Sequence, residues 1–234
     1  MFNINTKYLI DKAFKPNDLI TKELKRNNKK KIKEVIKSAN LKYQIKGEER
    51  PSLINDVYNY QVIVFFEVEL NNIKSANYVN SILQKEAIKA PCVFKFCNTN
   101  SCCHAFADKR LTLQEGETIV TDNTVITAIQ PKNSKTDERL NYKNIPNKQN
   151  KRCFYTELKV KVHVLSNIKL IMELSTAFNS HLWYDETKKM QFFKLLKDLQ
   201  TLEQQQAKTV ISRDKAELNI KMKELITETQ RCHK

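Results

Sequence analysis

The chain contains 234 residues, with 41 Lys and Arg against 26 Asp and Glu, which gives a net charge of +15, and it has only two glycines. Dinucleotide-binding and Walker A loops need several glycines, because only a residue without Cβ allows backbone N–H groups to close around a pyrophosphate. The composition therefore excludes both classes of nucleotide-binding loop.

The positive charge is concentrated toward the two ends of the sequence. Residues 1–50 carry a net charge of +8, residues 51–130 carry −2, and residues 131–234 carry +9. A neutral centre with basic flanks favours a polyanionic partner held by peripheral elements. Codon bias offers a second explanation, since most of the basic residues are Lys and the chain is also rich in Asn and Ile.

The sequence gives no sign of a membrane segment. Its longest uninterrupted apolar run covers residues 62–66, whereas a membrane-spanning helix needs about 20 apolar residues. The first residues also lack the basic and then apolar pattern of a secretory signal. We therefore expect a cytoplasmic protein with no membrane partner. In that reducing compartment its cysteines should remain thiols. No cofactor is expected.

A basic amphipathic helix is predicted near the start of the chain. Asp18 or Thr21 can cap a helix that runs to about Ala39, with an apolar stripe along one side. We predict that its other side binds nucleic acid. This basic face consists of Lys22, Lys25, Arg26, Lys29, Lys30 and Lys33.

The middle of the chain predicts a small mixed sheet. Residues 58–70 are rich in β-branched and aromatic side chains and form a long strand, and residues 75–87 have helical spacing. Residues 92–97 form a second strand with residues 104–107 as its hairpin partner, and residues 119–129 continue the strand material. A strand, a helix and a strand in this order indicate a crossover connection, so we predict an α+β fold with helices packed on the sheet.

Residues 131–152 are polar and basic, and they predict a long exposed loop. Tyr142 and Phe154 lie beside its charges, where aromatic rings can stack on bases. Residues 154–164 are predicted to form a strand or an extended segment. The candidate nucleic-acid ligands of the loop are Lys143, Lys148, Lys151 and Arg152.

A helical tail is predicted after the core. We place an α+β core domain at residues 1–165 and a helical region at residues 166–234, where apolar residues recur at helical spacing. The narrow apolar stripe is typical of a coiled coil, within the chain or between chains, so oligomers are possible partners. The stretch 186–230 fits either one long helix or a hairpin with a second cap at Ser212.

Three short motifs carry a resemblance. They are YQVIVFFEVEL at 60–70, ILQKEAIKAP at 82–91 and SRDKAELNIKMKEL at 212–225. Their order resembles the bacterial domain-of-unknown-function family 4391, whose members share an FEIEL-like strand, a KAIP-like helix exit and a VELN-like stretch before a charged helix. The family is similar to proteins encoded beside DNA methyltransferases and helicases in restriction-like defence loci. The resemblance therefore implies an accessory of DNA modification or phage defence, and it brings no catalytic residue.

Two carboxylates form a candidate catalytic site. Glu67 and Glu69 are two positions apart on the predicted strand 58–70, so both point to one face, and Asp56 offers a third carboxylate. A metal-dependent nuclease needs such a group, but a restriction-type strand would carry Lys two positions after the acidic residue. The alternative is the solvated face of a half-buried strand.

Cys97, Cys102 and His104 form a candidate metal site, with Cys153 or His163 as further ligands. Structural zinc is usually held by two closely spaced pairs of Cys or His. The spacing here matches no standard zinc finger, so thiols on adjoining strands are the alternative.

The sequence thus supports three functional hypotheses. The first is a non-enzymatic accessory protein that binds DNA or RNA through its basic elements and a methyltransferase or helicase through its C-terminal helices. The second is a metal-dependent nuclease, and the third is a protein–protein scaffold that binds no nucleic acid.

Overall fold

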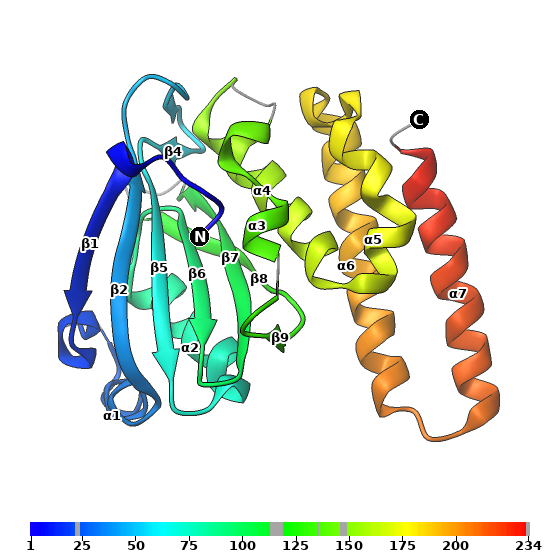
Figure 1. The fold of residues 1–234 in the computed structure, drawn as a ribbon, viewed down its shortest axis with the longest axis horizontal. Coiled ribbons are helices and arrows are strands. Elements are labelled where there is room, and N and C mark those ends of the chain that lie inside the picture. The colour runs from blue at the N-terminus through cyan, green and yellow to red at the C-terminus, as the bar shows by residue number, and fades with distance from the viewer. Residues whose placement is uncertain (22–23, 113–118, 135, 146–148, 233–234) are drawn as a thin grey trace. The chain divides into compact units, whose positions relative to one another are not determined.

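The computed structural model describes residues 1–21, 24–112, 119–134, 136–145 and 149–232 (Figure 1). The chain divides into two compact units, Met1–Ser166 and Asn167–Lys234. The first unit contains a mixed sheet with helices, and the second unit is helical. The protein is therefore α+β with C-terminal helices, as the sequence predicted.

Among the described residues, the large sheet of the first unit contains seven strands. Their order is β1-β2-β5-β6-β7-β8, with β9 also paired to β7, and a separate small sheet joins β3 to β4. The β5–β6 pair is parallel, and the other neighbours are antiparallel. The strands are β1 (Leu9–Phe14), β2 (Ile36–Ile45), β3 (Leu53–Ile54), β4 (Asn59–Tyr60), β5 (Ile63–Leu70), β6 (Cys92–Cys97), β7 (Ser101–Leu111), β8 (Ile119–Ile126) and β9 (Gln130–Pro131).

A helical crossover joins the two parallel strands β5 and β6. It consists of η3 (Ile73–Ser75), α2 (Ala76–Ile82) and η4 (Leu83–Ala87). The side chain of Asn72 accepts the backbone N–H of Lys74 and so caps the start of the crossover. Two parallel neighbours require such a connection because the chain must return to the same end of the sheet, and this predicted element is confirmed.

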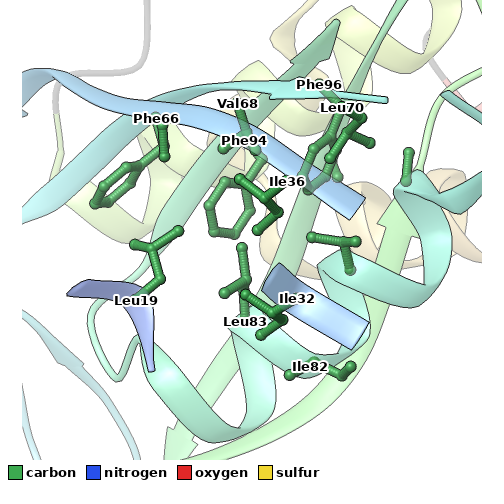
Figure 2. Packing of buried hydrophobic residues seen from close by; sticks show 14 of the residues in the cluster. Leu19, Ile32, Ile36, Phe66, Val68, Leu70, Ile82, Leu83, Phe94 and Phe96 are labelled. Carbon is green, nitrogen blue, oxygen red and sulfur yellow. The ribbon is translucent and has the colours of Figure 1, made fainter. Parts of the chain in front are cut away.

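The main hydrophobic core lies between one face of the sheet and the helices α1 (Arg26–Val35) and α2. Phe66, Val68 and Leu70 of β5 point into it, together with Ile32 of α1 and Ile82 of α2 (Figure 2). Side chains alternate along a strand, so the residues between them, including Glu67, belong to the opposite face. We call these the core face and the polar face of the sheet.

The predicted N-terminal helix is shorter than expected. The helix α1 ends at Val35, and the following residues Ile36–Ile45 form β2, which pairs with β1 and β5. Ile36 and Ala39 continue the apolar spacing of α1 and so match a helix locally, but they are buried as strand residues in the core. Pairing across the sheet therefore overrides the local helical pattern.

The predicted strand at residues 154–164 is wrong, because Lys151–Ser166 form the helix α4. Val160, Val162 and Val164 alternate with polar residues and imitate the period of a strand. The contacts that fix the helix are tertiary. The hydroxyl of Tyr155 accepts the backbone N–H of Ala107 at 2.9 Å, and one turn later Lys159 forms an ion pair with Asp108.

The predicted long exposed loop at residues 131–152 is also corrected. It contains α3 (Thr136–Arg139) and η5 (Tyr142–Asn144), and its last two residues begin α4. The rings of Tyr142 and Phe154 are buried edge to face, with centres 5.3 Å apart, and their centres lie 4.5 and 4.3 Å from the central carbon of the Arg50 guanidinium. These two aromatic side chains are therefore part of the interior and are not available to stack on bases.

The second unit contains a helical hairpin. The unit comprises α5 (Ile168–Leu174), η6 (Ser175–Asn179), η7 (His181–Tyr184), α6 (Glu186–Lys208) and α7 (Ser212–Arg231). The hairpin is formed by α6 and α7. The side chain of Asp185 caps α6 by accepting the backbone N–H of Lys188. Residues 209–211 separate α6 from α7, and the two helices contact each other, so the hairpin is the correct alternative. The predicted cap at Ser212 is wrong, because Ser212 is the first residue of α7 and no described side chain caps this helix. Within the described ranges, no helix is long and apolar enough to cross a membrane.

Candidate nucleic-acid interface

Helix α1 presents cationic side chains to solvent. Arg26, Lys30 and Lys33 follow one another at spacings of four and three residues, so they line one side of the helix. Ile32 is buried on the other side and anchors α1 in the core. Lys25, at the start of the helix, is also exposed. We call Lys25, Arg26, Lys30 and Lys33 the basic ridge.

Acidic residues of α1 neutralise little of the positive charge of the basic ridge. Glu34 is the acidic residue of α1, and its carboxylate lies 3.9 Å from the Lys30 ammonium. An exposed ion pair of this kind contributes little to stability. A phosphate can therefore replace Glu34 as the partner of Lys30. Lys29, another predicted ligand, is half-buried, and Lys22 lies outside the described residues.

The basic residues near 131–152 do not join this surface. Lys143 is exposed, Lys151 is buried, Arg152 is half-buried, and Lys148 lies outside the described residues. The Lys151 ammonium donates to the carbonyls of Gly47 and Arg50 at 2.9 and 2.8 Å and to Ser52 Oγ at 3.1 Å. This cation is therefore enclosed by protein oxygens and cannot contact a phosphate.

Arg152 and α1 are also separated by the sheet. The Arg152 guanidinium lies 4.0 Å above the ring of Tyr58. Its helix α4 covers the polar face, where Tyr155 packs against Phe106 of β7, whereas α1 covers the core face. The two predicted basic elements are thus on opposite sides of the sheet, and α1 forms the more coherent surface.

Two exposed residues at the contact of α1 with α2 were not among the predicted ligands. Lys31 of α1 is exposed, and its ammonium lies 5.9 Å from the centre of the Tyr78 ring of α2. Lys31 belongs to the same run of lysines and could have been included from the sequence. Tyr78 could not, because its place beside α1 depends on the packing of α1 against α2.

The candidate catalytic carboxylates are only partly brought together. Glu67 and Glu69 both lie on the polar face, as predicted, and Lys95 of β6 is the register partner of Glu67. Asp56 is exposed in the turn between β3 and β4. The carbonyl of Val57, the residue after Asp56, accepts the backbone N–H of Leu111 at 2.8 Å. Leu111 lies seven residues along β7 from His104, the register partner of Lys95, so Asp56 is not placed beside Glu67.

The Glu69 carboxylate is engaged by β2. It accepts hydrogen bonds from Lys37 Nζ at 2.8 Å and from Ser38 Oγ at 3.3 Å. The hydrogen bond from Lys37 lowers the pKa of Glu69 below its ordinary value. Nearby on β2, Lys42 Nζ and Asn40 Nδ2 donate to the Asp11 carboxylate at 2.7 and 2.9 Å. This end of the polar face is a network of paired charges.

The candidate metal ligands share the same face without forming a metal site. Cys97 and Cys102 are register partners in the β6–β7 hairpin, and His104 follows two residues later. Each thiol lies near a backbone carbonyl, Cys97 Sγ at 3.7 Å from Val68 and Cys102 Sγ at 3.6 Å from Pro131. Burial raises the pKa of the Cys97 thiol, which opposes the thiolate that zinc requires.

The ring of His104 packs against Phe2, with 5.2 Å between the ring centres. In the part of the chain that the structure describes, no group of three or more His, Cys, Asp or Glu is arranged to hold a metal ion. The paired thiols are therefore explained as buried side chains of adjoining strands.

A buried lysine in the first unit was not identified from the sequence. Lys109 of β7 donates to the carbonyls of Gln84 and Ile88, the latter at 2.8 Å, and to Thr121 Oγ1 at 3.0 Å. Burial lowers its pKa to about 8. Because its acceptors include carbonyls at the end of the crossover helix, Lys109 acts as a cap for that helix.

Comparison with known proteins identifies one family. A family model described as "Domain of unknown function (DUF4391)" matches residues 2–228. No curated protein and no solved structure matches the chain. The matched range includes both the unit that carries α1 and the helical hairpin, so both parts belong to what the family shares.

Proposed function

The chain belongs to the DUF4391 family, and we propose that it is a non-enzymatic accessory protein that binds nucleic acid through α1 and an enzyme through its C-terminal helices. The observation that carries this proposal is the basic ridge of exposed side chains on α1. The setting we propose is a bacterial DNA-modification or phage-defence system, as the resemblance of its motifs implies.

The geometry of the ridge suits a phosphate backbone. Arg26 and Lys33 are seven residues apart, which is about 10 Å along an α-helix, and a DNA duplex rises by about 3.4 Å per base pair. The ridge therefore faces the phosphates of about three successive nucleotides. Each cation that neutralises a phosphate releases a counterion, and this release favours binding.

A groove on the helical hairpin supports a partner site. It lies between α6 and α7, has a volume of about 420 Å³ and contains the apolar side chains of Leu202 and Leu225. The charged lining residues are mainly acidic: Asp198, Glu224 and Glu228 against Lys221. We propose that this groove receives a basic amphipathic helix of a methyltransferase or helicase, in a coiled-coil arrangement.

Binding of labelled oligonucleotides at several salt concentrations tests the nucleic-acid half of the proposal. We expect that affinity for DNA falls with salt and that the triple variant Arg26→Gln, Lys30→Gln, Lys33→Gln reduces the log–log slope for duplex by about 3. The matched control removes three exposed charges from the hairpin: Lys194→Gln, Lys215→Gln and Lys223→Gln. Absence of measurable binding at about 50 mM salt, or equal losses in both variants, would contradict the proposal.

Purification of the tagged full chain from its native cells tests the partner half. We expect a methyltransferase or helicase to co-purify and to be lost in the charge-reversed variant Glu224→Lys, Glu228→Lys. Glu217→Lys is the control, because Glu217 is exposed on α7 but does not line the groove. Recovery of the enzyme with the groove variant would place the partner site elsewhere.

A metal-dependent nuclease is the second candidate, favoured by the register of Glu67 opposite Lys95. A carboxylate and a lysine ammonium on one face are groups that phosphodiester cleavage uses. The test is cleavage of DNA or RNA with Mg²⁺ or Mn²⁺ by the parent protein, Glu67→Ala and Glu69→Ala. Cleavage that is lost in both variants would support this candidate, and an inactive parent protein would exclude it.

A further inference from the structure

Tyr78 places an aromatic ring beside Lys31 of α1, which lies about 100° around the helix from Lys30 of the basic ridge. Tyr78 lies on α2, and 42% of the residue is exposed although its neighbours Val79 and Asn80 are fully buried. The ring is next to the cationic helix α1, since the Lys31 ammonium lies 5.9 Å from its centre. A single exposed aromatic side chain is common on protein surfaces. The feature that points to a ligand is this exposed ring together with the exposed Lys31 ammonium beside it.

The position of the Tyr78 ring is fixed by polar contacts. Its hydroxyl donates a hydrogen bond of 3.0 Å to Asn28 Oδ1, and Asn28 Nδ2 donates one of 2.8 Å to Glu86 Oε1. This chain of hydrogen bonds links α2 to α1 and then to η4. A ring held in this way loses little conformational freedom when a planar ligand stacks on it.

We propose that Tyr78 is a stacking platform for a nucleobase and that the ligand of α1 is consequently a single-stranded nucleic acid. The proposal rests on the proposed function, because it concerns the same surface. It identifies Tyr78 as a binding residue and assigns the class of ligand, single strands in preference to duplex.

The preference follows from where bases are accessible. In a duplex both faces of each base are stacked on neighbouring base pairs, so a ring on the outside of α2 meets only the backbone. In a single strand an unstacked base can cover the ring while its phosphates lie along the neighbouring cations. The combination of one fixed aromatic ring and a row of cations is the arrangement used for binding of single strands without a strict sequence requirement.

Binding of a labelled oligo-dT of about 12 nucleotides and of a mixed-sequence duplex of the same length tests the proposal. The variants are Tyr78→Ala, which removes the ring, and Tyr78→Phe, which keeps the ring and removes the hydrogen bond to Asn28. Tyr184→Ala is the control because Tyr184 is an exposed tyrosine of the second unit. Circular dichroism and thermal melting of each variant check that it is folded.

We expect Tyr78→Ala to weaken binding of the single strand by about tenfold and binding of the duplex by less than about twofold, in keeping with the loss of one stacked base. Tyr78→Phe and Tyr184→Ala should remain within about twofold of the parent protein for both ligands. In the parent protein, ultraviolet crosslinking to a strand containing 5-iodouracil should label Tyr78.

Two results would overturn the proposal. If Tyr78→Ala binds the single strand as well as the parent protein does, or loses affinity equally for both ligands, the stacking role is wrong while nucleic-acid binding by α1 stands. If the parent protein binds neither ligand, the proposed function itself fails.

Discussion

The Lys151 ammonium donates a hydrogen bond of 2.9 Å to the backbone carbonyl of Gly47, which lies 104 residues earlier in the chain. The two residues come from α4 and from the turn after β2, so this bond ties the helix on the polar face to the start of the segment that leads into β3. Lys151, which the sequence predicted as a phosphate ligand, thus stabilises the interior of the protein.

Lys151→Met is expected to destabilise the protein by about 1–3 kcal/mol without changing nucleic-acid affinity. Methionine fills a similar volume, but the carbonyls of Gly47 and Arg50 and the hydroxyl of Ser52 lose their shared donor. Urea unfolding measures the change. Lys143→Met is the control, because Lys143 is exposed and its replacement should change stability by less than about 0.5 kcal/mol.

Gly47→Ala should cost about 1 kcal/mol of stability through backbone strain alone. Gly47 has φ +93°, and a Cβ placed on it would meet no atom within 4 Å. The cost therefore comes from the left-handed conformation and not from a clash. Asn tolerates positive φ better than Ala does, so thermal melting should rank the parent protein first, Gly47→Asn second and Gly47→Ala last. Equal melting temperatures would contradict this account.

Lys109 should make stability depend on pH above neutrality. Its pKa is lowered to about 8 in the folded protein, against about 10.4 in an unfolded chain. Between these two values the unfolded chain holds more protons, so the free energy of unfolding rises with pH in this window. Below pH 8 the amine is protonated in both states, and its effect is constant.

The variant Lys109→Met isolates this effect. The free energy of unfolding of the parent protein minus that of the variant should increase by about 2–3 kcal/mol from pH 8 to pH 10.5. Tyr and Cys side chains that titrate in the same range are common to both proteins and cancel in the difference. A difference that stays constant with pH would show that Lys109 keeps an ordinary pKa.

Tyr155→Phe should reveal how firmly α4 is held on the sheet. The Tyr155 hydroxyl accepts the backbone N–H of Ala107 at 2.9 Å and lies 2.9 Å from the carbonyl of Cys92, to which it donates. Phenylalanine keeps the ring contact with Phe106 but removes the acceptor of the Ala107 N–H and one of two donors to the Cys92 carbonyl, which Gln84 Nε2 also contacts at 3.1 Å. We expect a loss of about 1–3 kcal/mol in denaturant unfolding, whereas the exposed hydroxyl of Tyr184 should be removable at little cost.

The parts of the fold that the sequence predicted are those with a distinct local pattern. In β5, Val64 to Phe66 are buried and Glu67 and Glu69 then alternate with Val68, and both features are typical of a strand. The crossover follows because parallel strands need it. The sequence did not decide between one long helix and the hairpin of α6 and α7, because the break at Val210 and Ile211 contains no Pro or Gly.

The parts that were mispredicted depend on distant contacts. The alternation of Val160 with Lys159 and Lys161 predicts a strand, yet Lys159 is buried in a helix, where it pairs with Asp108, 51 residues earlier in the chain. Local periodicity carries no information about such partners. The same holds for the candidate site, where the lysine run of α1 was visible and Tyr78 was not.

Because side chains alternate along β5, substitutions at adjacent residues of this strand affect opposite faces of the sheet. A substitution at Val68 disturbs the contacts that seat α1 and α2, while a substitution at Glu67, the adjacent residue, alters charge on the reverse side of the same strand. Suppressor mutations of the first should therefore collect among the helices, and those of the second among β2 and β6, so that a single eight-residue strand reports separately on the two faces of the sheet.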